Sequence, residues 1–511
     1  MKTPDFLVLG SGLAGLSFAA LMAKAGRSVR LIEAHEFPGG YGHSFVLANK
    51  YKFNAQLHYA WDCRPGEPVH RLLEALGIAD EISFDFFDSA GFDRMRAPGI
   101  ELDVPFDYQL LSQRLCDLFP SHKSNIQAFI RLIPWTGRSL NRYGGSMRKS
   151  GVGDKAIAFA KLRKYLRATL QDVFDEHNLP LEAQTLLALR WPCFMLPPNR
   201  VSFFAWVGLV HGYHSGACSV SGGFDQLIER LVKIINDNGG EVIYKERVVS
   251  LPVNGDRISK VVTQSVKSPE RLAEYQGKSI ICNFDPKQAA EMIGLEKFSR
   301  QVQKRLDYDY SPSNLIAYCA VKDIDLKKLG FGRSILYHTS EMDLNKAYDN
   351  MYLLGDYSKP SFAISTPSLH SEPSQHCPEG THLIEFVTVA EYRRFLNLKV
   401  TSRREYRRKK KEIFEHIVCA AEKYHIPDLS SKICFDSTGS PTTNERYCLS
   451  PMGNSYGSNL TPRNISIFRL DEKTSFSNFY FCNASSGFAG FAGTLATGLR
   501  LYEILGADAT S

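Results

Sequence analysis

The stretch of sequence that decides the fold is FLVLGSGLAGLSFAALMAKAGRSVRLIE, which runs from Phe6 to Glu33. A short apolar strand, Phe6 to Leu9, leads into the glycine-rich turn Gly10 to Gly15, and a helical pattern follows. A second apolar strand, Val29 to Ile32, then ends beside the acid Glu33. Strand, glycine turn, helix, strand and acid in this order predict a Rossmann-like dinucleotide-binding unit.

Each part of this fingerprint has a physical task. Gly10 permits the tight turn, Gly12 lets the backbone approach a pyrophosphate, and Gly15 lets the helix pack closely on the strand. The helix N-terminus offers free N–H groups and a partial positive charge to phosphates, and Glu33 can accept hydrogen bonds from a ribose. The predicted cofactor contacts of this unit are Gly10, Gly12, Leu13, Ala14, Gly15, Glu33 and Ala34.

Two alternatives for this segment carry less weight. A glycine-rich turn without a ligand would not need the acid at the expected distance. The run Phe6 to Ala23 carries no charge and is about long enough to span a bilayer. However, Asp5 precedes it, no basic segment leads it, and its glycines have the fingerprint spacing. The same features argue against a signal peptide.

The composition is that of an ordinary globular protein. Hydrophobic residues make up 44% and charged residues 23% of the 511 residues, enough for roughly two to four domains' worth of core. The net charge of +7 permits contact with an anionic membrane but does not require it. The 11 cysteines are scattered, without a CxxC pair or a Cys/His cluster at metal spacing. We therefore expect free thiols, no metal site and a reducing, cytoplasmic location, with peripheral membrane contact left open.

One dense basic run, Arg403 to Lys411, precedes apolar residues at helical spacing. It is most simply the solvated face of an amphipathic helix whose buried side carries Ile413 and Ile417. Lipid or nucleic-acid contact at this run is the alternative, and nothing else in the sequence favours a nucleic-acid partner.

Further strand and helix patterns recur in the middle and at the end of the chain. Helices are expected over 222–235 and 494–505, and strands over 241–244, 247–251, 279–283 and 479–482. The apolar stretch Val201 to Val210 fits either a buried element or the wall of an apolar pocket. Because nucleotide-type segments occur at the start, middle and end, two interleaved domains explain the chain better than a linear series.

Several motifs outside the fingerprint point to one family. Pro38 to Phe45 contains a second glycine pair, Tyr51 to Tyr59 reads as a strand that ends in His-Tyr, and Gly439 to Tyr447 follows later. With these motifs the chain resembles the flavin-dependent amine oxidase and phytoene desaturase superfamily. The carotenoid isomerase and retinol saturase branch is the most similar, and the likeness spans nearly the whole chain.

The resemblance implies an α/β, two-domain FAD-dependent oxidoreductase. A Rossmann-like FAD-binding domain would comprise residues 1–60, 213–295 and 436–511. A mixed α+β substrate domain, residues 61–212 and 296–435, would be interleaved with it. The implied cofactor is FAD, and no second dinucleotide fingerprint is visible. Electrons would then pass directly between the flavin and the substrate, a quinone, oxygen or a free reductant.

The resemblance also implies roles for residues beyond the fingerprint. Further cofactor contacts would come from Gly39, Gly40, His43, Ser44, Val248, Asn483, Phe491, Gly493 and Thr494. The candidate catalytic groups are His58, Glu445, Arg446 and Asn483. Each has a simpler reading: a core histidine, a surface ion pair, and an asparagine that fixes a turn.

Some positions depart from the family pattern. Asn54 stands where an Asp is usual, Gln56 where a Gly is usual, and Asn483-Ala484 where a Gly-Ala or Gly-Asp pair is common. These changes bear on the reaction more than on the fold. The expected substrate is a long apolar unsaturated molecule, with desaturation, saturation and cis–trans isomerisation all open. The alternatives are amine oxidase-like dehydrogenation of a polar substrate and a non-catalytic prenyl-lipid escort protein of the same fold.

Overall fold

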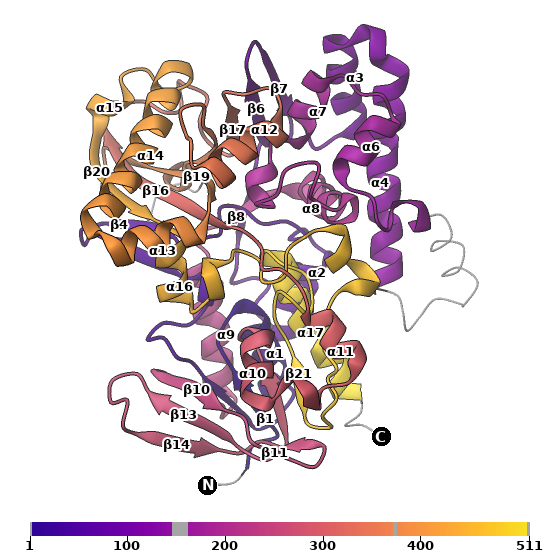
Figure 1. Ribbon diagram of the computed structural model, residues 1–511, viewed down its shortest axis with the longest axis vertical. Helices are drawn as coiled ribbons and strands as arrows, with labels where there is room; N and C mark the ends of the chain where they lie inside the picture. The colour runs from indigo at the N-terminus through magenta and orange to yellow at the C-terminus, as the bar shows by residue number, and fades with distance from the viewer. Residues whose placement is uncertain (1–2, 146–161, 371–375, 508–511) are drawn as a thin grey trace.

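The computed structural model describes residues 3–145, 162–370 and 376–507. A five-stranded parallel sheet lies near the N-terminus, in the order β21-β15-β1-β2-β9 (Figure 1). Its strands come from three distant parts of the chain: β1 (Phe6–Leu9), β2 (Val29–Ile32), β9 (Glu241–Ile243), β15 (Ser279–Cys282) and β21 (Phe479–Phe481).

Helices cover both faces of this sheet because the side chains of β1 alternate between two apolar cores. Phe6 and Val8 join the core that contains α1 (Leu13–Lys24), which packs against α9 (Asp225–Asp237) and α17 (Phe491–Ala507). Leu7 and Leu9 join the other core, with α10 (Pro286–Ile293). Helix α9 begins three residues later than the sequence predicts, since Gly222 and Gly223 have φ of 77° and 111°.

A small antiparallel sheet is attached beside this domain, in the order β10-β13-β14. Its strands are β10 (Glu246–Ser250), β13 (Val261–Ser265) and β14 (Leu272–Tyr275). The register between β10 and β13 shifts between Val248 and Ser250, which is a bulge. A bulge leaves one residue out of the ladder and redirects the main chain near it.

A larger seven-stranded sheet forms the other half of the molecule, in the order β20-β16-β19-β18-β17-β6-β7. Its strands are β6 (Asp93–Ala97), β7 (Ile100–Val104), β16 (Ser313–Lys322), β17 (Ile335–Thr339), β18 (Ser361–Ser365), β19 (Thr381–Ala390) and β20 (Ile433–Gly439). Neighbouring strands are antiparallel except for β17 and β6.

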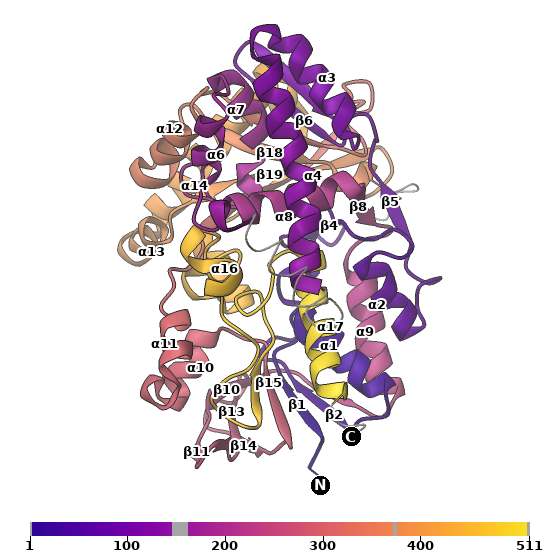
Figure 2. The same ribbon diagram turned by 90° about the vertical axis from the view of Figure 1, so that its right-hand side faces the viewer.

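Two groups of helices flank this sheet at its opposite ends (Figures 1 and 2). Next to β6 and β7 lie α3 (Tyr108–Leu118), α4 (Lys123–Gly145) and α7 (Leu181–Ala188). Next to β20 lie α13 (Tyr392–Thr401), α14 (Arg403–Tyr424) and α15 (Leu429–Lys432). The basic run opens α14, and Ile413 and Ile417 on that helix are buried, as expected.

The apolar stretch at Val201 to Val210 forms most of α8 (Phe203–Gly216). Phe203, Trp206 and Val207 are fully buried in the large core. The segment is therefore a core helix, and it does not line the main cavity described below.

Each of the two large sheets takes its strands from distant parts of the chain, as an interleaved pair of domains requires. The predicted domain boundaries stay a prediction. Over the described residues, no helix is both long and apolar enough to cross a bilayer.

Candidate dinucleotide-binding site

A cavity of about 630 Å³ lies at the carboxyl ends of the parallel strands β1, β2, β15 and β21. Ligands in such α/β folds bind at this edge of the sheet. Segments from across the chain line it: Gly10–Ala14, Ile32–His35, Gly39–His43, Gln56–Leu57, Glu246–Val248, Asn283–Pro286, Tyr447–Pro451, Asn454–Gly457 and Asn483–Ser485, with Phe37, Gln288, Glu291, Met292, Ala489, Gly490 and Thr494.

Most of the predicted cofactor contacts line this cavity. They are Gly10, Gly12, Leu13, Ala14, Glu33, Ala34, Gly39, Gly40, His43, Val248, Asn483 and Thr494. Seven predicted site residues do not line it: Gly15, Ser44, Phe491, Gly493, His58, Glu445 and Arg446.

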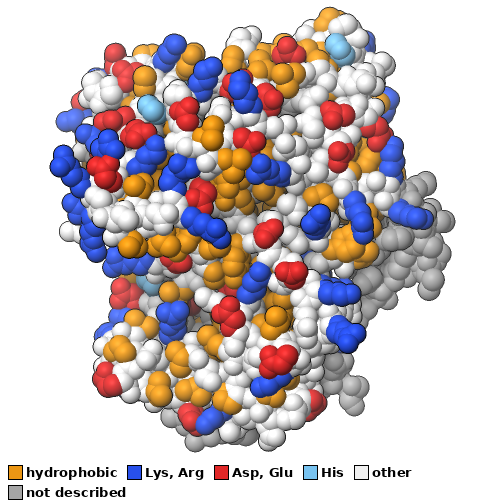
Figure 3. Space-filling view, in the orientation of Figure 1, with side chains coloured by type: hydrophobic (Ala, Val, Ile, Leu, Met, Phe, Trp, Pro, Cys, Tyr) orange, Lys and Arg blue, Asp and Glu red, His pale blue; other side chains and the backbone are white. Residues whose placement is uncertain are grey.

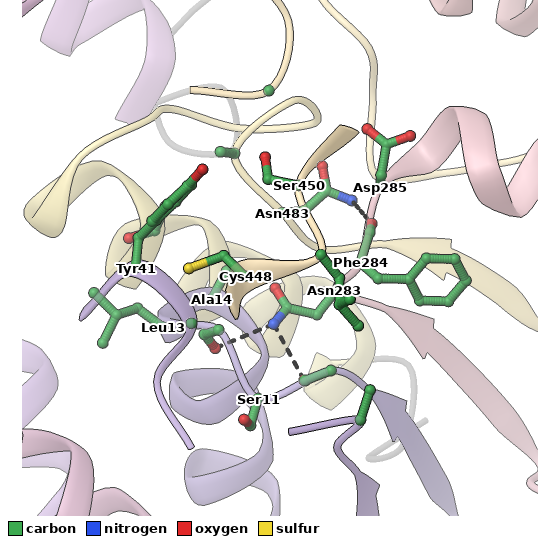
Figure 4. A pocket seen from close by; sticks show the side chains of 18 of the residues that line it. Ser11, Leu13, Ala14, Tyr41, Asn283, Phe284, Asp285, Cys448, Ser450 and Asn483 are labelled. Atoms are coloured by element: carbon green, nitrogen blue, oxygen red, sulfur yellow. Dashed lines mark hydrogen bonds between the residues drawn. The ribbon is translucent and has the colours of Figure 1, made fainter. Parts of the chain in front are cut away.

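The side chain of Asn283, which follows β15, is hydrogen-bonded to the glycine-rich turn and holds it in place (Figure 4). Its Nδ2 donates hydrogen bonds to the carbonyl oxygens of Gly10 and Gly12, both at 3.1 Å. A Cβ on Gly12 would lie 2.9 Å from this nitrogen, and a Cβ on Gly15 would lie 2.7 Å from it. A side chain at Gly12 or Gly15 would therefore meet Asn283 first, while contact of Gly12 with the pyrophosphate stays a prediction.

The first turn of α1 keeps its donors available for a ligand. Gly12 is the N-cap, no side chain caps the helix, and Leu13 and Ala14 line the cavity. The first N–H groups of a helix have no acceptor within the helix and attract anions.

Glu33 is held in place at the end of β2. Its Oε2 accepts hydrogen bonds from the amide and hydroxyl of Ser11, at 2.7 and 2.5 Å, and its Oε1 accepts from the amide of His35 at 2.7 Å. The carboxylate still lines the cavity and has lone pairs left for hydroxyl donors.

The second glycine pair packs directly on the first turn. The amide of Gly39 donates to the carbonyl of Ser11 at 2.9 Å, and Gly39 has a φ of 108° that favours glycine. His43 closes this loop through Nδ1, 2.5 Å from the carbonyl oxygen of Gly40. Burial lowers the pKa of His43, so its ring is neutral at pH 7 and holds the loop rather than supplying charge.

Val248 lies at the bulge of β10 and lines the cavity. Together, an uncapped helix start, a positioned acid and a redirected strand provide donors for phosphates, an acceptor for a ribose and main-chain groups for a base. The residues present therefore fit a dinucleotide.

Three predicted cofactor contacts have other tasks. The hydroxyl of Ser44 donates to Asn54 Oδ1 at 3.0 Å and to Asp225 Oδ1 at 3.1 Å, which ties its strand to α9. Phe491 is buried edge-on against Phe224, and a Cβ on Gly493 would lie 2.7 Å from the Cβ of Phe488. These contacts are structural, and cofactor contact at Ser44, Phe491 and Gly493 stays a prediction.

The catalytic candidates His58, Glu445 and Arg446 are also placed differently from expectation. His58 Nδ1 lies 2.8 Å from Oε2 of the fully buried Glu385. Glu445 accepts a hydrogen bond from the Tyr392 hydroxyl at 2.6 Å, and Arg446 is exposed. None of the three lines the cavity, and their catalytic role stays a prediction.

Asn483 does line the cavity, but its side chain fixes the C-terminal turn. Its Nδ2 donates to the carbonyls of Cys282 and Phe284, both at 3.2 Å, and its Oδ1 accepts from the amides of Ser485 and Ser486 at 3.0 and 3.1 Å. The geometry favours the turn-fixing alternative over a hydrogen bond to the cofactor.

Asn483→Ala should therefore lower stability and flavin content together, while the rate per bound flavin stays the same. Loss of four hydrogen bonds at a buried site should cost about 2–4 kcal/mol. Thermal unfolding, flavin absorbance and stopped-flow rates normalised to bound flavin measure the three quantities. A fall in the normalised rate at full stability would restore a catalytic role for Asn483.

Sequence reasoning missed several residues of the cavity wall. Asn283 and Phe284 follow a strand adjacent to β1, so the parallel order of the sheet was the signal that could have located them. Tyr447 to Pro451 lines the cavity from the end of α16 (Pro441–Cys448), just after the candidates Glu445 and Arg446. Figure 4 shows Cys448 and Ser450 beside Tyr41 on this wall.

Comparison with known proteins agrees with this geometry. The model of the NAD(P)-binding Rossmann-like domain matches residues 8–76. All-trans-retinol 13,14-reductase of Danio rerio is 21% identical, over 98% of this chain and 86% of its own length. Prolycopene isomerase 1 of an Oncidium hybrid is 20% identical, over 95% of this chain and 80% of its own.

Among solved structures, a putrescine oxidase variant has a TM-score of 0.66 at 13% identity and covers 99% of both chains. An oxidoreductase from Methanosarcina mazei has a TM-score of 0.63 at 16% identity, over 98% of this chain and 99% of its own. These comparisons support a likeness to the flavin-dependent oxidoreductase superfamily. Within it, the chain is similar to retinol reductases and prolycopene isomerases over nearly its whole length. It is an oxidoreductase with a flavin cofactor and the two-domain fold of this superfamily.

Proposed function

We propose that this oxidoreductase binds FAD and acts on carbon–carbon double bonds of a long apolar polyene of the retinoid or carotenoid class. When bound, the flavin supplies hydride or electron exchange with a carbon of the polyene. The names of the relatives, a retinol reductase and prolycopene isomerases, support this substrate class.

One observation carries the proposal: much of the cavity wall carries no charged side chain. The Asp, Glu, Arg and His residues of the wall are Glu33, His35, His43, Glu246, Arg247, Asp285 and Glu291. The segments Gln56–Leu57, Tyr447–Pro451, Asn454–Gly457 and Ala489–Gly490 contribute no Asp, Glu, Lys, Arg or His, and they form the uncharged part of the wall. A cationic amine would find no carboxylate there, whereas an apolar chain suits such a wall.

Three ionisable groups of the wall, Tyr41, Cys448 and Tyr456, are held neutral by burial. Burial raises the pKa of Tyr41 and Tyr456, and it raises the pKa of Cys448 to about 12. Tyr41 donates its hydroxyl hydrogen to the carbonyl of Asn454 at 2.7 Å. These groups shape the wall and exclude water without placing a charge next to the substrate.

Gln56 gives the uncharged part of the wall a fixed polar group. Its Nε2 donates to Asn314 Oδ1 and Asn444 Oδ1, both at 3.2 Å, and its Oε1 accepts from Asn314 Nδ2 at 2.5 Å. The amide is oriented by both partners, so it can position a substrate without ionising.

The reaction direction can be tested with the purified protein under anaerobic conditions. We expect all-trans-retinol or a carotenoid to reoxidise the chemically reduced flavin, to bleach the oxidised flavin, or to be isomerised without net redox change. In this order, the three outcomes would indicate saturation, desaturation and isomerisation of the polyene. Bleaching by putrescine, with no response to any polyene, would replace the proposal by the amine oxidase alternative.

Binding should also depend on the length of the apolar chain. Each buried methylene is worth about 0.8 kcal/mol, so each missing carbon should weaken binding several-fold. Quenching of flavin fluorescence along a chain-length series measures this. A flat series would contradict an apolar substrate.

Electron transfer to or from a quinone, oxygen or a free reductant remains part of the proposal, as does a cytoplasmic location.

A further inference from the structure

A strongly basic surface lies at the start of α14, far along the chain from the cofactor fingerprint. Lys and Arg side chains gather along this edge, over α13 and α14 (Figure 3). The run Arg403 to Lys411 contains seven basic residues and one acidic residue, a net charge of +6, while the whole chain carries +7. Nearly all of the net charge is therefore concentrated on one short segment.

Ion pairs join Arg408, Lys409 and Lys411 to acids on the same helix, but three arginines of the run are not placed to stabilise it. Arg403 and Arg404 occupy the first turn of α14, next to the N-cap Ser402. The N-terminus of a helix carries a partial positive charge and favours acidic residues. Arg403, Arg404 and Arg407 are exposed, and within the described chain no ion pair joins them to an acid. This arrangement costs helix stability unless an external anion is present.

Exposed aliphatic side chains lie beside these cations. Val400, at the end of α13, is 76% exposed, and Leu353 and Leu354 are 50% and 68% exposed. Arg394 Nη2 and Nη1 donate to the carbonyls of Leu353 and Leu354 at 2.7 and 3.0 Å. Lys409 Nζ donates to the next carbonyl, that of Gly355, at 2.9 Å. The leucine pair is thus held between α13 and the basic turns of α14.

We propose that this surface docks on an anionic lipid bilayer. The arginines would lie against acidic headgroups while Leu353, Leu354 and Val400 enter the interfacial region. Basic residues flanking inserted apolar side chains are the chemistry of peripheral membrane contact. A nucleic acid would use the cations but would leave three exposed aliphatic side chains without a partner. The surface is independent of the flavin chemistry proposed above.

The decisive variant reverses three unpaired charges: Arg403→Glu, Arg404→Glu and Arg407→Glu. Co-sedimentation would use vesicles of phosphatidylcholine with and without phosphatidylserine. The native protein should bind only the anionic vesicles, less so as salt rises. Each cation near such a surface contributes about fivefold in affinity, so the triple variant should lose binding by at least about 100-fold.

The fold itself should tolerate this variant. Acidic residues in the first turn favour a helix, so the thermal midpoint should stay the same or rise. The matched control is Lys297→Glu, Arg300→Glu and Lys304→Glu, an equal charge change on exposed positions at α11 (Arg300–Leu306) in the other half of the molecule. The control should retain vesicle binding.

The aliphatic contribution is tested separately. The variant Leu354→Ser and Val400→Ser keeps every charge and should weaken vesicle binding by at least about tenfold. Equal loss in the α11 control, no preference for anionic vesicles, or unchanged binding in the serine variant would each overturn the proposal. Tighter binding to a short RNA or DNA than to vesicles would also overturn it. Flavin content should be unchanged in all three variants, so these results do not depend on the redox function.

Discussion

A methyl group on Gly15 should abolish flavin binding, whereas a methyl group on Gly12 should do so only while Asn283 keeps its amide. At Gly12 the added carbon would lie 2.9 Å from Asn283 Nδ2, and no other atom is within 3.4 Å. At Gly15 it would lie 2.7 Å from that nitrogen and also 2.7 Å from the carbonyl oxygen of Gly10. The side chain can be removed by mutation, but the backbone oxygen cannot.

The test is a pair of double-mutant cycles on flavin content. Asn283→Ala alone should weaken flavin binding moderately, because two hydrogen bonds to the glycine turn are lost. In that background Gly12→Ala should cost nothing further, while Gly15→Ala should still remove the flavin. Coupling between neighbours of this kind is what such cycles resolve.

The expectation fails if Gly12→Ala remains as costly without the Asn283 amide as with it. That result would mean that Gly12 is required by the pyrophosphate itself, as the sequence alone suggests. A Gly15→Ala protein with full flavin absorbance would contradict the close approach of α1 to the turn. Circular dichroism and thermal unfolding separate loss of flavin from loss of the fold.

The parallel sheet could be predicted from the sequence because its signals are local. Residues 6–33 contain strand, turn, helix and acid in direct succession, and the expected strands at 241–244, 279–283 and 479–482 all join the same sheet. The run at 279–283 is buried on both faces, so a short window identifies it. The larger antiparallel sheet depends on pairings between distant segments, which no local window contains.

The glycine-rich part of the site was predictable because its signals are also local in the sequence. The uncharged part of the wall was not predictable. Backbone contacts such as Gly10 and Gly39 follow from conformational needs that the sequence displays. The uncharged wall is formed by side chains brought together by tertiary structure, and the fingerprint carries no information about them. Glu445 and Arg446 show the limit, because the last two residues of their helix, Tyr447 and Cys448, and the turn after it line the cavity instead.

The buried ion pair beneath the large sheet should be the most sensitive point for stability. Asp93, on β6, and Arg190 are 0% and 2% exposed, and Asp93 Oδ2 accepts from Arg190 Nε at 3.0 Å and from Nη2 at 2.6 Å. The guanidinium carbon lies 5.6 Å from the ring centre of Phe92. Removal of one partner leaves the other charge buried and unpaired, which costs about 3–5 kcal/mol of stability. Total stability of a domain is about 5–15 kcal/mol.

The two single variants should respond to pH in different ways. Burial raises the pKa of Asp93 to about 6 even with Arg190 present, and Arg190→Met should raise it further. A carboxyl whose pKa is higher in the folded than in the unfolded state destabilises the fold as pH rises between the two values. Arg190→Met should therefore be less destabilised at about pH 5 than at about pH 8. Asp93→Ala has no carboxyl at this position and leaves a guanidinium that cannot lose its proton, so the stability of this variant should lack this pH dependence.

The double variant Asp93→Leu with Arg190→Met removes both charges and supplies apolar volume. It should recover most of the stability lost in either single variant, because replacement of a buried pair by packed apolar groups is often neutral. Thermal midpoints at a fixed heating rate, measured for all four proteins at both pH values, decide the matter. If the two single variants showed equal pH dependence, solvent would reach the unpaired carboxylate of Asp93. The ion pair would then contribute little to the stability of the fold.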